Sequence, residues 1–200
     1  MKPGYYYDNA RTDVIDIVPI TRADAILEVG GGDFPTLHRL GDELGAKTWG
    51  VDVRAPTIPF DGFVLGSVTD PAVVDRLPRA FDLVIANDVI EHVEDTETFF
   101  RVIYGLLRPG GLLAMSVPNI RQIRTAYQLF VRGTFPRDEA GLFDRTHVRW
   151  FCKGDVVRLA TDAGFTLKTW RGSGRLVPSA LARTPMAEFL ALQNLFVFRK

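Results

Sequence analysis

The chain has 200 residues, and 24 Lys and Arg side chains balance 24 Asp and Glu side chains, so its formal net charge is zero. This balance argues against a dedicated nucleic-acid-binding protein and against an anionic membrane as partner. A hydrophobic content of 46% and this length suit one globular domain with a sizeable core, while the single cysteine, Cys152, excludes a disulfide framework and a Cys-rich zinc site.

The beginning of the chain, MKPGYYYDNARTD, lacks the apolar segment of a secretory signal peptide. No apolar run approaches the ~20 residues that a membrane-spanning helix requires. From these two observations we expect a soluble, cytoplasmic protein without membrane contact.

Apolar segments of strand length alternate with segments of helical periodicity, which is the pattern of a parallel sheet with crossover helices. The pattern predicts strands at 25–30, 47–52, 62–66, 81–86, 111–117, 165–170 and 192–198. It predicts helices at 35–45, 71–77, 95–107, 121–132 and 154–163. We therefore expect a single α/β domain, residues 1–200, with a seven-stranded, mainly parallel sheet whose last strand, 192–198, is antiparallel.

Local turn signals support two of these boundaries. Asp70-Pro71 reads as a helix cap followed by proline at the first helical position. The segment 108–111, RPGG, predicts the end of one helix and a turn into the next strand.

The first predicted strand runs into three glycines, in AILEVGGGDFPTL (residues 25–37). Glycines at this place let a ligand approach the backbone at the carboxyl end of a parallel strand. A phosphate-binding P-loop would continue to Gly-Lys-Ser/Thr, but no lysine follows before Lys47, and a dinucleotide fingerprint would need a further glycine. Glu28 and Asp33 instead suit a ligand with positive charge, such as S-adenosylmethionine, which carries a sulfonium and an ammonium group and no phosphate.

Asp52 ends the second predicted strand about twenty residues after the glycines. An acidic side chain at this position can accept hydrogen bonds from both ribose hydroxyls. This feature alone fits NAD equally well, so an NAD-dependent oxidoreductase is a rival that the missing third glycine and Glu28 disfavour.

In the order and spacing of its motifs, the chain resembles the class I S-adenosylmethionine-dependent methyltransferases. The matching segments are LEVGGGD, WGVDV, FDLVIANDVIEHVED and LLRPGGLLAMSVPN, which together cover roughly residues 20–120. The segments YYYDNARTDVIDIVP and LFDRTHVRWF look like the branch associated with glycan and small-metabolite methylation, similar to ubiquinone-biosynthesis O-methyltransferases. The resemblance implies a Rossmann-like fold and S-adenosylmethionine as cofactor.

The resemblance also implies a set of cofactor-binding residues, at the ends of four strands. Ser67 departs from the family pattern, which often has an acid or amide there to contact the adenine. Phe34 stands where a third glycine is usual, and it either narrows the methionine pocket or packs under the following helix. The full set is Glu28, Gly30, Gly31, Gly32, Asp52, Val53, Ser67, Val68, Asn87 and Asp88.

Candidate catalytic residues lie in NDVIEHV, where Asp88 precedes Glu91 by about one helical turn. If this segment turns helically, both carboxylates and the His92 imidazole face one cleft. In a first hypothesis His92 is a general base for the acceptor hydroxyl. In an alternative without a catalytic role, Glu91 and His92 only shape the loop.

A second hypothesis is a divalent cation held by Asp88, Glu91 and His92. It rests on the resemblance, because ubiquinone-biosynthesis O-methyltransferases and small-RNA 2′-O-methyltransferases carry a similar metal-binding segment, and the latter add a distal histidine for which His147 is the counterpart. Such ligands suit Mg²⁺, Mn²⁺ or zinc.

Three further candidates, Arg145, His147 and Arg149, lie in FDRTHVRWF. Arginines there can bind a carboxylate or phosphate of the acceptor, such as that of a nucleotide-linked sugar, or else form a salt-bridged turn. We expect segments 119–151 and 172–188 to recognise the substrate, and residues 1–20, with Tyr5–Tyr7 and Arg11, to form a lid.

The sequence thus favours O-methylation of a small metabolite or sugar, with N-methylation of a small molecule close behind. A non-catalytic S-adenosylmethionine-binding module, with its pocket closed by Phe34, is the alternative from another class. A nucleic-acid substrate is disfavoured, and a solvated helix face is the simpler interpretation of Arg121, Arg124, Arg132 and Arg137.

Overall fold

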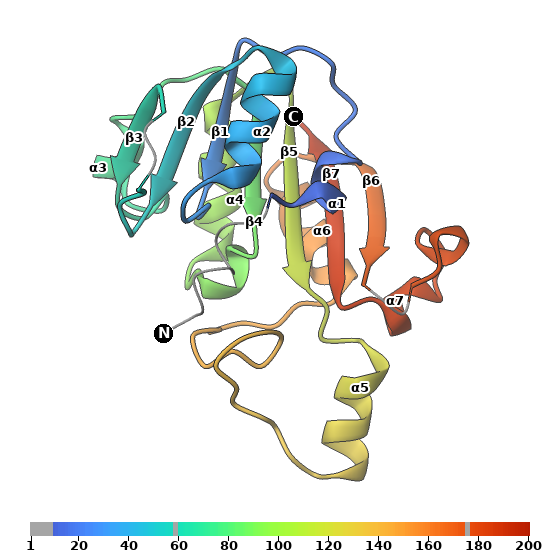
Figure 1. The fold of residues 1–200 in the computed structure, drawn as a ribbon. Helices are drawn as coiled ribbons and strands as arrows, with labels where there is room; N and C mark the ends of the chain where they lie inside the picture. The colour runs from blue at the N-terminus through green and yellow to red at the C-terminus, as the bar shows by residue number, and fades with distance from the viewer. Residues whose placement is uncertain (1–9, 58–59, 175–176) are drawn as a thin grey trace.

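A seven-stranded sheet forms the centre of the protein in the computed structural model, which describes residues 10–57, 60–174 and 177–200 (Figure 1). The strands lie in the order β3-β2-β1-β4-β5-β7-β6, and only β7 runs antiparallel to its neighbours. Their bounds are β1 Ala25–Val29, β2 Lys47–Asp52, β3 Gly62–Leu65, β4 Phe81–Asn87, β5 Leu107–Pro118, β6 Thr166–Ser173 and β7 Gln193–Arg199. The predicted mainly parallel sheet with an antiparallel last strand is confirmed.

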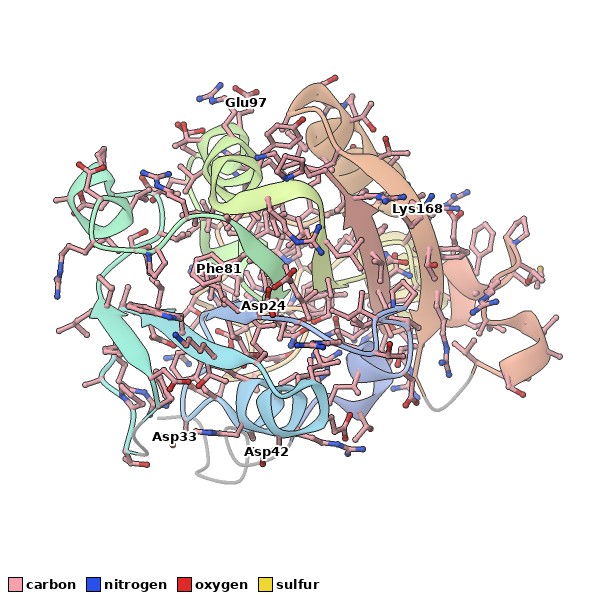
Figure 2. The ribbon with its side chains drawn as sticks, turned by 90° about the horizontal axis from the view of Figure 1, so that it is seen from above. Asp24, Asp33, Asp42, Phe81, Glu97 and Lys168 are labelled. Atoms are coloured by element: carbon pink, nitrogen blue, oxygen red, sulfur yellow. The ribbon has the colours of Figure 1, made fainter. Side chains whose placement is uncertain are left out.

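Helices cover both faces of the sheet, as the view from above shows (Figure 2). Along β4, Leu83 and Ile85 belong to a core cluster with α1 and α2, whereas Val84 and Ala86 belong to the cluster with α4 and α6. This alternation explains why β4 reads as a continuous apolar run: both of its faces are buried. The helices are α1 Thr12–Ile15, α2 Pro35–Leu44, α3 Pro71–Val74, η2 Ile90–His92, α4 Thr96–Leu106, α5 Ile123–Ala126, η3 Tyr127–Val131, α6 Lys153–Asp162, η4 Ser179–Leu181 and α7 Ala187–Leu190.

The two turn signals have different outcomes. Asp70 caps α3 as predicted, since its side chain accepts a hydrogen bond from the Ala72 amide at 2.9 Å. The turn predicted at 108–111 does not precede β5 but interrupts it, because Phe81 pairs with Leu107 and the next paired residue, Leu83, faces Leu112. The irregularity includes Gly110, whose φ of +78° favours glycine.

The carboxyl ends of β1, β2 and β4 meet at one edge of the sheet, and the connector 119–151 begins there. This connector forms a lobe that carries α5 and η3 and projects from the sheet before the chain returns to α6 (Figure 1). The N-terminal segment that the sequence predicts as a lid is described only from residue 10, and Tyr5–Tyr7 lie outside the described residues. None of the helices in the described part of the chain is long and apolar enough to cross a membrane.

Candidate functional site

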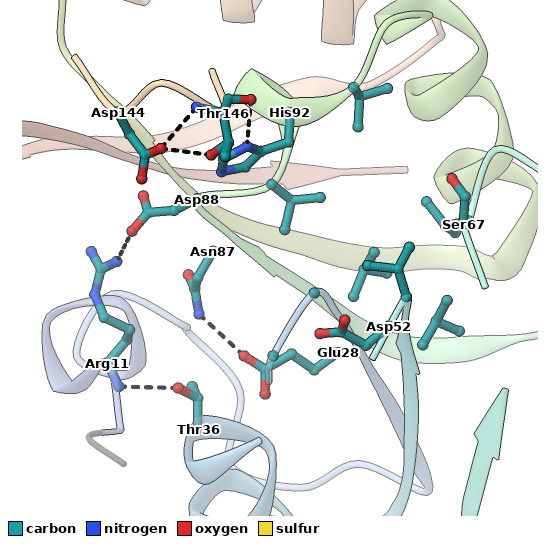
Figure 3. A pocket seen from close by; sticks show the side chains of 18 of the residues that line it. Arg11, Glu28, Thr36, Asp52, Ser67, Asn87, Asp88, His92, Asp144 and Thr146 are labelled. Atoms are coloured by element: carbon teal, nitrogen blue, oxygen red, sulfur yellow. Dashed lines mark hydrogen bonds and ion pairs between the residues drawn. The ribbon is translucent and has the colours of Figure 1, made fainter. Parts of the chain in front are cut away.

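A cavity of about 900 Å³ opens at this edge of the sheet, between the ends of β1, β2 and β4 and the connector (Figure 3). Nine of the ten predicted cofactor-binding residues line it. The exception is Gly32, whose amide donates a hydrogen bond to Asp52 Oδ2 at 3.0 Å and so holds that carboxylate in place. The lining residues that bear on the argument are Arg11, Glu28, Gly30, Gly31, Thr36, Asp52, Val53, Ser67, Val68, Asn87, Asp88, His92, Glu139, Asp144, Arg145 and Thr146.

The glycines after β1 are required by the side chains packed against them. A Cβ on Gly30 would come within 2.7 Å of a Val89 methyl group, and φ there is +70°. A Cβ on Gly31 would come within 2.3 Å of the Phe34 ring and 2.9 Å of the Glu28 carboxyl carbon. The bare backbone beside Glu28 is therefore a packing requirement as well as an opening for a ligand.

Phe34 does not narrow the cavity. Its side chain is fully buried, packs edge-on against Phe60 with ring centroids 5.0 Å apart, and is absent from the cavity lining. Of the two roles that the sequence allowed, the structure shows packing in the core. The closed pocket expected for a non-catalytic module is thus not formed by this residue.

Hydrogen-bond acceptors dominate the inner part of the cavity. Glu28 accepts from the Leu37 amide at 2.9 Å and from Asn87 Nδ2 at 3.4 Å, and burial raises its pKa to about 7. The Asp52 carboxylate accepts from the Gly32 and Arg54 amides and faces the cavity, while the buried Asn87 Oδ1 accepts no hydrogen bond from the described residues. These acceptors fit a ligand that donates hydrogen bonds and carries positive charge, as the amino group, the ribose hydroxyls and the sulfonium of S-adenosylmethionine do.

The two arginines in the cavity lining already have carboxylate partners. Arg11 Nη1 lies 2.8 Å from Asp88 Oδ2 and also donates to Ser116 Oγ at 3.0 Å. Arg145 pairs with Glu139. A phosphate of a cofactor would have to compete with these carboxylates, which agrees with the sequence argument against a phosphate-binding loop after β1.

The predicted catalytic residues divide into two groups. Asp88, at a φ of +54°, turns its carboxylate toward Arg11 and Ser116, and it lines the cavity together with His92. Glu91 is almost fully buried and lies outside the cavity lining. The expected shared cleft for both carboxylates is therefore wrong, because the helical turn begins only at Ile90, after the left-handed residue.

Glu91, His92 and His147 form the second group, in which one potential ligand atom from each residue lies within 4.8 Å of the others. His147 Nε2 is 3.9 Å from Glu91 Oε1, and the two imidazole rings are 4.8 Å apart. His92 Nδ1 lies 3.1 Å from the Thr146 carbonyl and His147 Nδ1 lies 3.0 Å from the Leu142 carbonyl. Because a carbonyl only accepts, both Nδ1 atoms donate, so in the neutral form of each ring Nε2 is the nitrogen that can accept a proton or bind a metal.

The predicted substrate-binding residues also separate. Arg145 lines the main cavity and, with His147, a neighbouring cavity of about 250 Å³ that contains Phe135, Phe143 and Trp150. Arg149 lies in neither lining, because its guanidinium donates twice to the Glu94 carbonyl, at 3.1 and 2.6 Å.

Several cavity residues were not predicted from the sequence as site residues, among them Thr36, Glu139, Asp144 and Thr146. The clearest available signal was Asp144-Arg145-Thr146. The Asp144 carboxylate accepts from the Thr146 amide and hydroxyl, at 2.9 and 2.7 Å, which is a turn that Asp-x-Thr commonly forms.

Comparison with known proteins agrees with the geometry. A family model described as a methyltransferase domain matches residues 9–169. The ubiquinone biosynthesis O-methyltransferase of Chromobacterium violaceum is 27% identical over 191 residues, which cover 86% of this chain and 78% of that protein. Phosphoethanolamine N-methyltransferase 2 of Caenorhabditis elegans is 27% identical over 126 residues, which cover 58% of this chain but only 29% of that protein.

A similar fold occurs in the crystal structure of 1,6-didemethyltoxoflavin-N1-methyltransferase from Burkholderia thailandensis with bound 1,6-didemethyltoxoflavin and S-adenosylhomocysteine. The TM-score is 0.67, the sequence identity is 19%, and the match covers 98% of this chain and 81% of that chain. At this identity the likeness concerns the fold.

Proposed function

This chain belongs to the methyltransferase domain family, as a member of the class I S-adenosylmethionine-dependent methyltransferases, and from that premise we propose that it methylates an oxygen atom of a small-molecule acceptor. The observation that carries the choice of oxygen is the position of His92. Its ring lies in the cavity wall with Nδ1 bonded to the Thr146 carbonyl, so Nε2 is a proton acceptor beside the expected transfer point. A hydroxyl acceptor needs such a group, whereas a neutral amine needs none.

The cofactor-binding part of the proposal assigns a role to each acceptor group. Asp52 accepts hydrogen bonds from the ribose hydroxyls, and Glu28 and Asn87 face the amino group of the methionine moiety. Gly30 and Gly31 leave the backbone open to that moiety. S-adenosylmethionine supplies a methyl group on a positively charged sulfur that leaves as a neutral thioether.

The chain's own contribution to chemistry is to orient the acceptor and to remove its proton. The Thr146 carbonyl accepts from His92 Nδ1 and so favours one tautomer of this ring. The ring of His147, which lies beside Glu91, packs against the His92 ring and limits its rotation. The proton of the acceptor hydroxyl passes to His92 Nε2 as oxygen attacks the methyl carbon. Asp88, held by Arg11 and Ser116, forms the wall next to this histidine.

A second candidate for the same step is a divalent cation held by Glu91, His92 and His147. The observation in its favour is the convergence of one carboxylate and two imidazoles whose other nitrogens are anchored to backbone carbonyls, an arrangement typical of metal-ligating histidines. Such an ion would lower the pKa of an acceptor hydroxyl. Asp88 is left out of this set, because its carboxylate is engaged by Arg11 and Ser116.

For the acceptor we propose an organic molecule with a hydroxyl group, such as a sugar or another small metabolite, that occupies the side of the cavity formed by the connector. Arg145 lies at the junction of the two cavities, where its guanidinium can exchange Glu139 for a carboxylate or phosphate of the acceptor. Arg149 is not part of this proposal because the Glu94 carbonyl occupies its guanidinium.

The first test is calorimetric titration of S-adenosylmethionine into metal-free protein, repeated with Mg²⁺ and Mn²⁺. We expect micromolar binding that NADH does not reproduce. Screening of hydroxyl and amine acceptors for formation of S-adenosylhomocysteine then decides the reaction, and NMR of the methylated product identifies the atom. Replacing His92 with alanine should preserve cofactor binding and abolish O-methylation.

Three results would contradict the proposal. Turnover that persists in His92→Ala would remove this histidine from the mechanism. Methylation of amines alone would favour the N-methyltransferase alternative, for which two of the relatives provide precedent by name. Absence of cofactor binding under every condition would favour a non-catalytic module.

A further inference from the structure

The helical segment 123–131 in the lobe exposes apolar side chains on its outer side. Phe130 is 86% exposed, Val131 70%, and Ile123 and Tyr127 55% each, and we call these four residues the outer face. On the inner side Thr125 is buried. A surface helix of a globular protein normally has the opposite arrangement, with its apolar side chains against the core. The outer face is therefore suited to contact something other than water.

Arginines alternate with and follow the residues of the outer face along the chain. Residues 121–137 contain four arginines and no acidic residue, although the chain as a whole has no net charge. Arg121 pairs with Glu188 at 2.5 Å, but no described carboxylate pairs with Arg124, Arg132 or Arg137. All three arginines are exposed, so their charge is available to an external partner.

The combination of charge and apolar surface distinguishes between possible occupants. A second copy of the chain bound through the same face would bring two groups of arginines together across a two-fold axis, which is unfavourable. The phosphates of a nucleic acid would bind the arginines, but the aliphatic side chains of Ile123 and Val131 can neither stack on bases nor pair with phosphates. An anionic lipid bilayer accepts both kinds of side chain, since apolar groups enter the acyl boundary while arginines meet phosphate headgroups.

We propose that the outer face docks on the surface of an anionic phospholipid bilayer, with Phe130 and Val131 inserted at the interface. The proposal departs from the expectation drawn from net charge, because that sum does not show where the charges lie. The same connector supplies Asp144, Arg145 and Thr146 to the cavity wall, so docking would hold the acceptor side of the cavity near the bilayer.

The test is co-sedimentation of the full chain with phosphatidylcholine vesicles that contain one quarter phosphatidylglycerol, compared with pure phosphatidylcholine. We expect binding to the anionic vesicles that weakens in 0.5 M salt. Phe130→Glu should lower the partition coefficient at least about tenfold, because it removes an inserted ring and adds a repelled charge. The matched control is Leu65→Glu, at a residue 52% exposed on β3, on the far edge of the sheet from the lobe (Figure 1).

A second pair of variants tests the charge separately from the apolar contact. Arg132→Gln with Arg137→Gln should weaken anionic binding and reduce its salt dependence, while the thermal unfolding temperature of the soluble protein stays unchanged. Equal binding to both kinds of vesicle, or no loss in Phe130→Glu, would overturn the proposal. So would a concentration-dependent dimer that Phe130→Glu dissociates in sedimentation velocity, because a second copy would then cover the face.

Discussion

Arg11 Nη1 lies 2.8 Å from Asp88 Oδ2, and this ion pair joins residues 77 positions apart at the wall of the cavity. The carboxylate also accepts from Ser116 Oγ at 2.9 Å, so three segments of the chain converge on one side chain. Asp88 holds a left-handed backbone conformation, which is uncommon for residues other than glycine. The pair therefore connects the N-terminal segment to the turn at Asp88, four residues before His92.

Removal of either partner of this pair should destabilise the protein. We expect Arg11→Met and Asp88→Asn each to lower the free energy of unfolding by about 1–3 kcal/mol, because each leaves a partly buried charge with fewer partners. The double variant should lose less than the sum of the two. Urea denaturation measures all three values.

An exposed pair on α2 provides the comparison. Arg39 and Glu43 lie 2.8 Å apart with both side chains about half exposed, so disrupting them should cost no more than about 0.5 kcal/mol. If the Arg11 and Asp88 effects were strictly additive, the two side chains would not stabilise each other, and the assigned coupling would be wrong.

Cofactor affinity should depend on Asp52 but not on the nearby Asp33. Asp52→Ala removes the acceptor for the ribose hydroxyls, and we expect the dissociation constant of S-adenosylmethionine to rise about 10- to 100-fold. Asp33 accepts two hydrogen bonds from Thr57 and does not line the cavity, so Asp33→Ala should leave that constant nearly unchanged. Calorimetry compares the two variants, and equal effects would refute the ribose assignment.

Cofactor affinity should also rise with pH through the titration of Glu28. Burial raises the pKa of Glu28 to about 7, so only about a tenth of this carboxyl is ionised at pH 6. If the ionised form faces the cationic methionine moiety, affinity should increase up to about tenfold between pH 6 and pH 8. The amino group of the ligand loses its proton over the upper part of this range and works in the opposite direction.

Glu28→Gln separates these two contributions, because it abolishes the increase and leaves only the dependence due to the ligand. The same variant tests stability. The native state holds a proton on Glu28 that the unfolded state has already released between about pH 4.5 and 7, so this residue makes the free energy of unfolding fall as pH rises through that range. A variant with an unchanged pH profile for both quantities would contradict the assignment.

Metal affinity should depend on the histidines of the cluster, His92 and His147, but not on His38, the third histidine of the chain. If Glu91, His92 and His147 hold a divalent cation, His147→Ala should weaken binding of Mn²⁺ or Zn²⁺ at least about tenfold while S-adenosylmethionine still binds. His38 packs against Phe60 outside the cavity, so His38→Ala serves as the control. Calorimetry with each metal measures the change, and no heat in the unaltered protein would leave His92 as the general base.

Much of the fold follows from local patterns in the sequence. The strand ends that line the cavity were predicted because apolar runs, terminal acids and glycines report backbone conformation within a few residues. Asp52 at the end of β2 and Gly30 after β1 both lie in the cavity as this reasoning requires. The helix cap at Asp70 was predicted for the same reason, since it depends only on its immediate neighbours.

The long-range contacts were decided only by the tertiary structure. The sequence placed Asp88 with Glu91 and His92 by helical spacing, but a left-handed residue before η2 turns its carboxylate to Arg11 instead. Nothing local shows that Phe34 enters the core. His147 reaches Glu91 across more than fifty residues, a proximity that only the family resemblance, and no local pattern, had suggested.

Sequence periodicity thus determined the sheet and the edge at which we propose that the cofactor binds, because strand alternation and turn chemistry are properties of short segments. The path of the connector 119–151 determined the second wall of the cavity, the histidine cluster and the exposed apolar helix, because these depend on which distant segments come into contact in the folded chain.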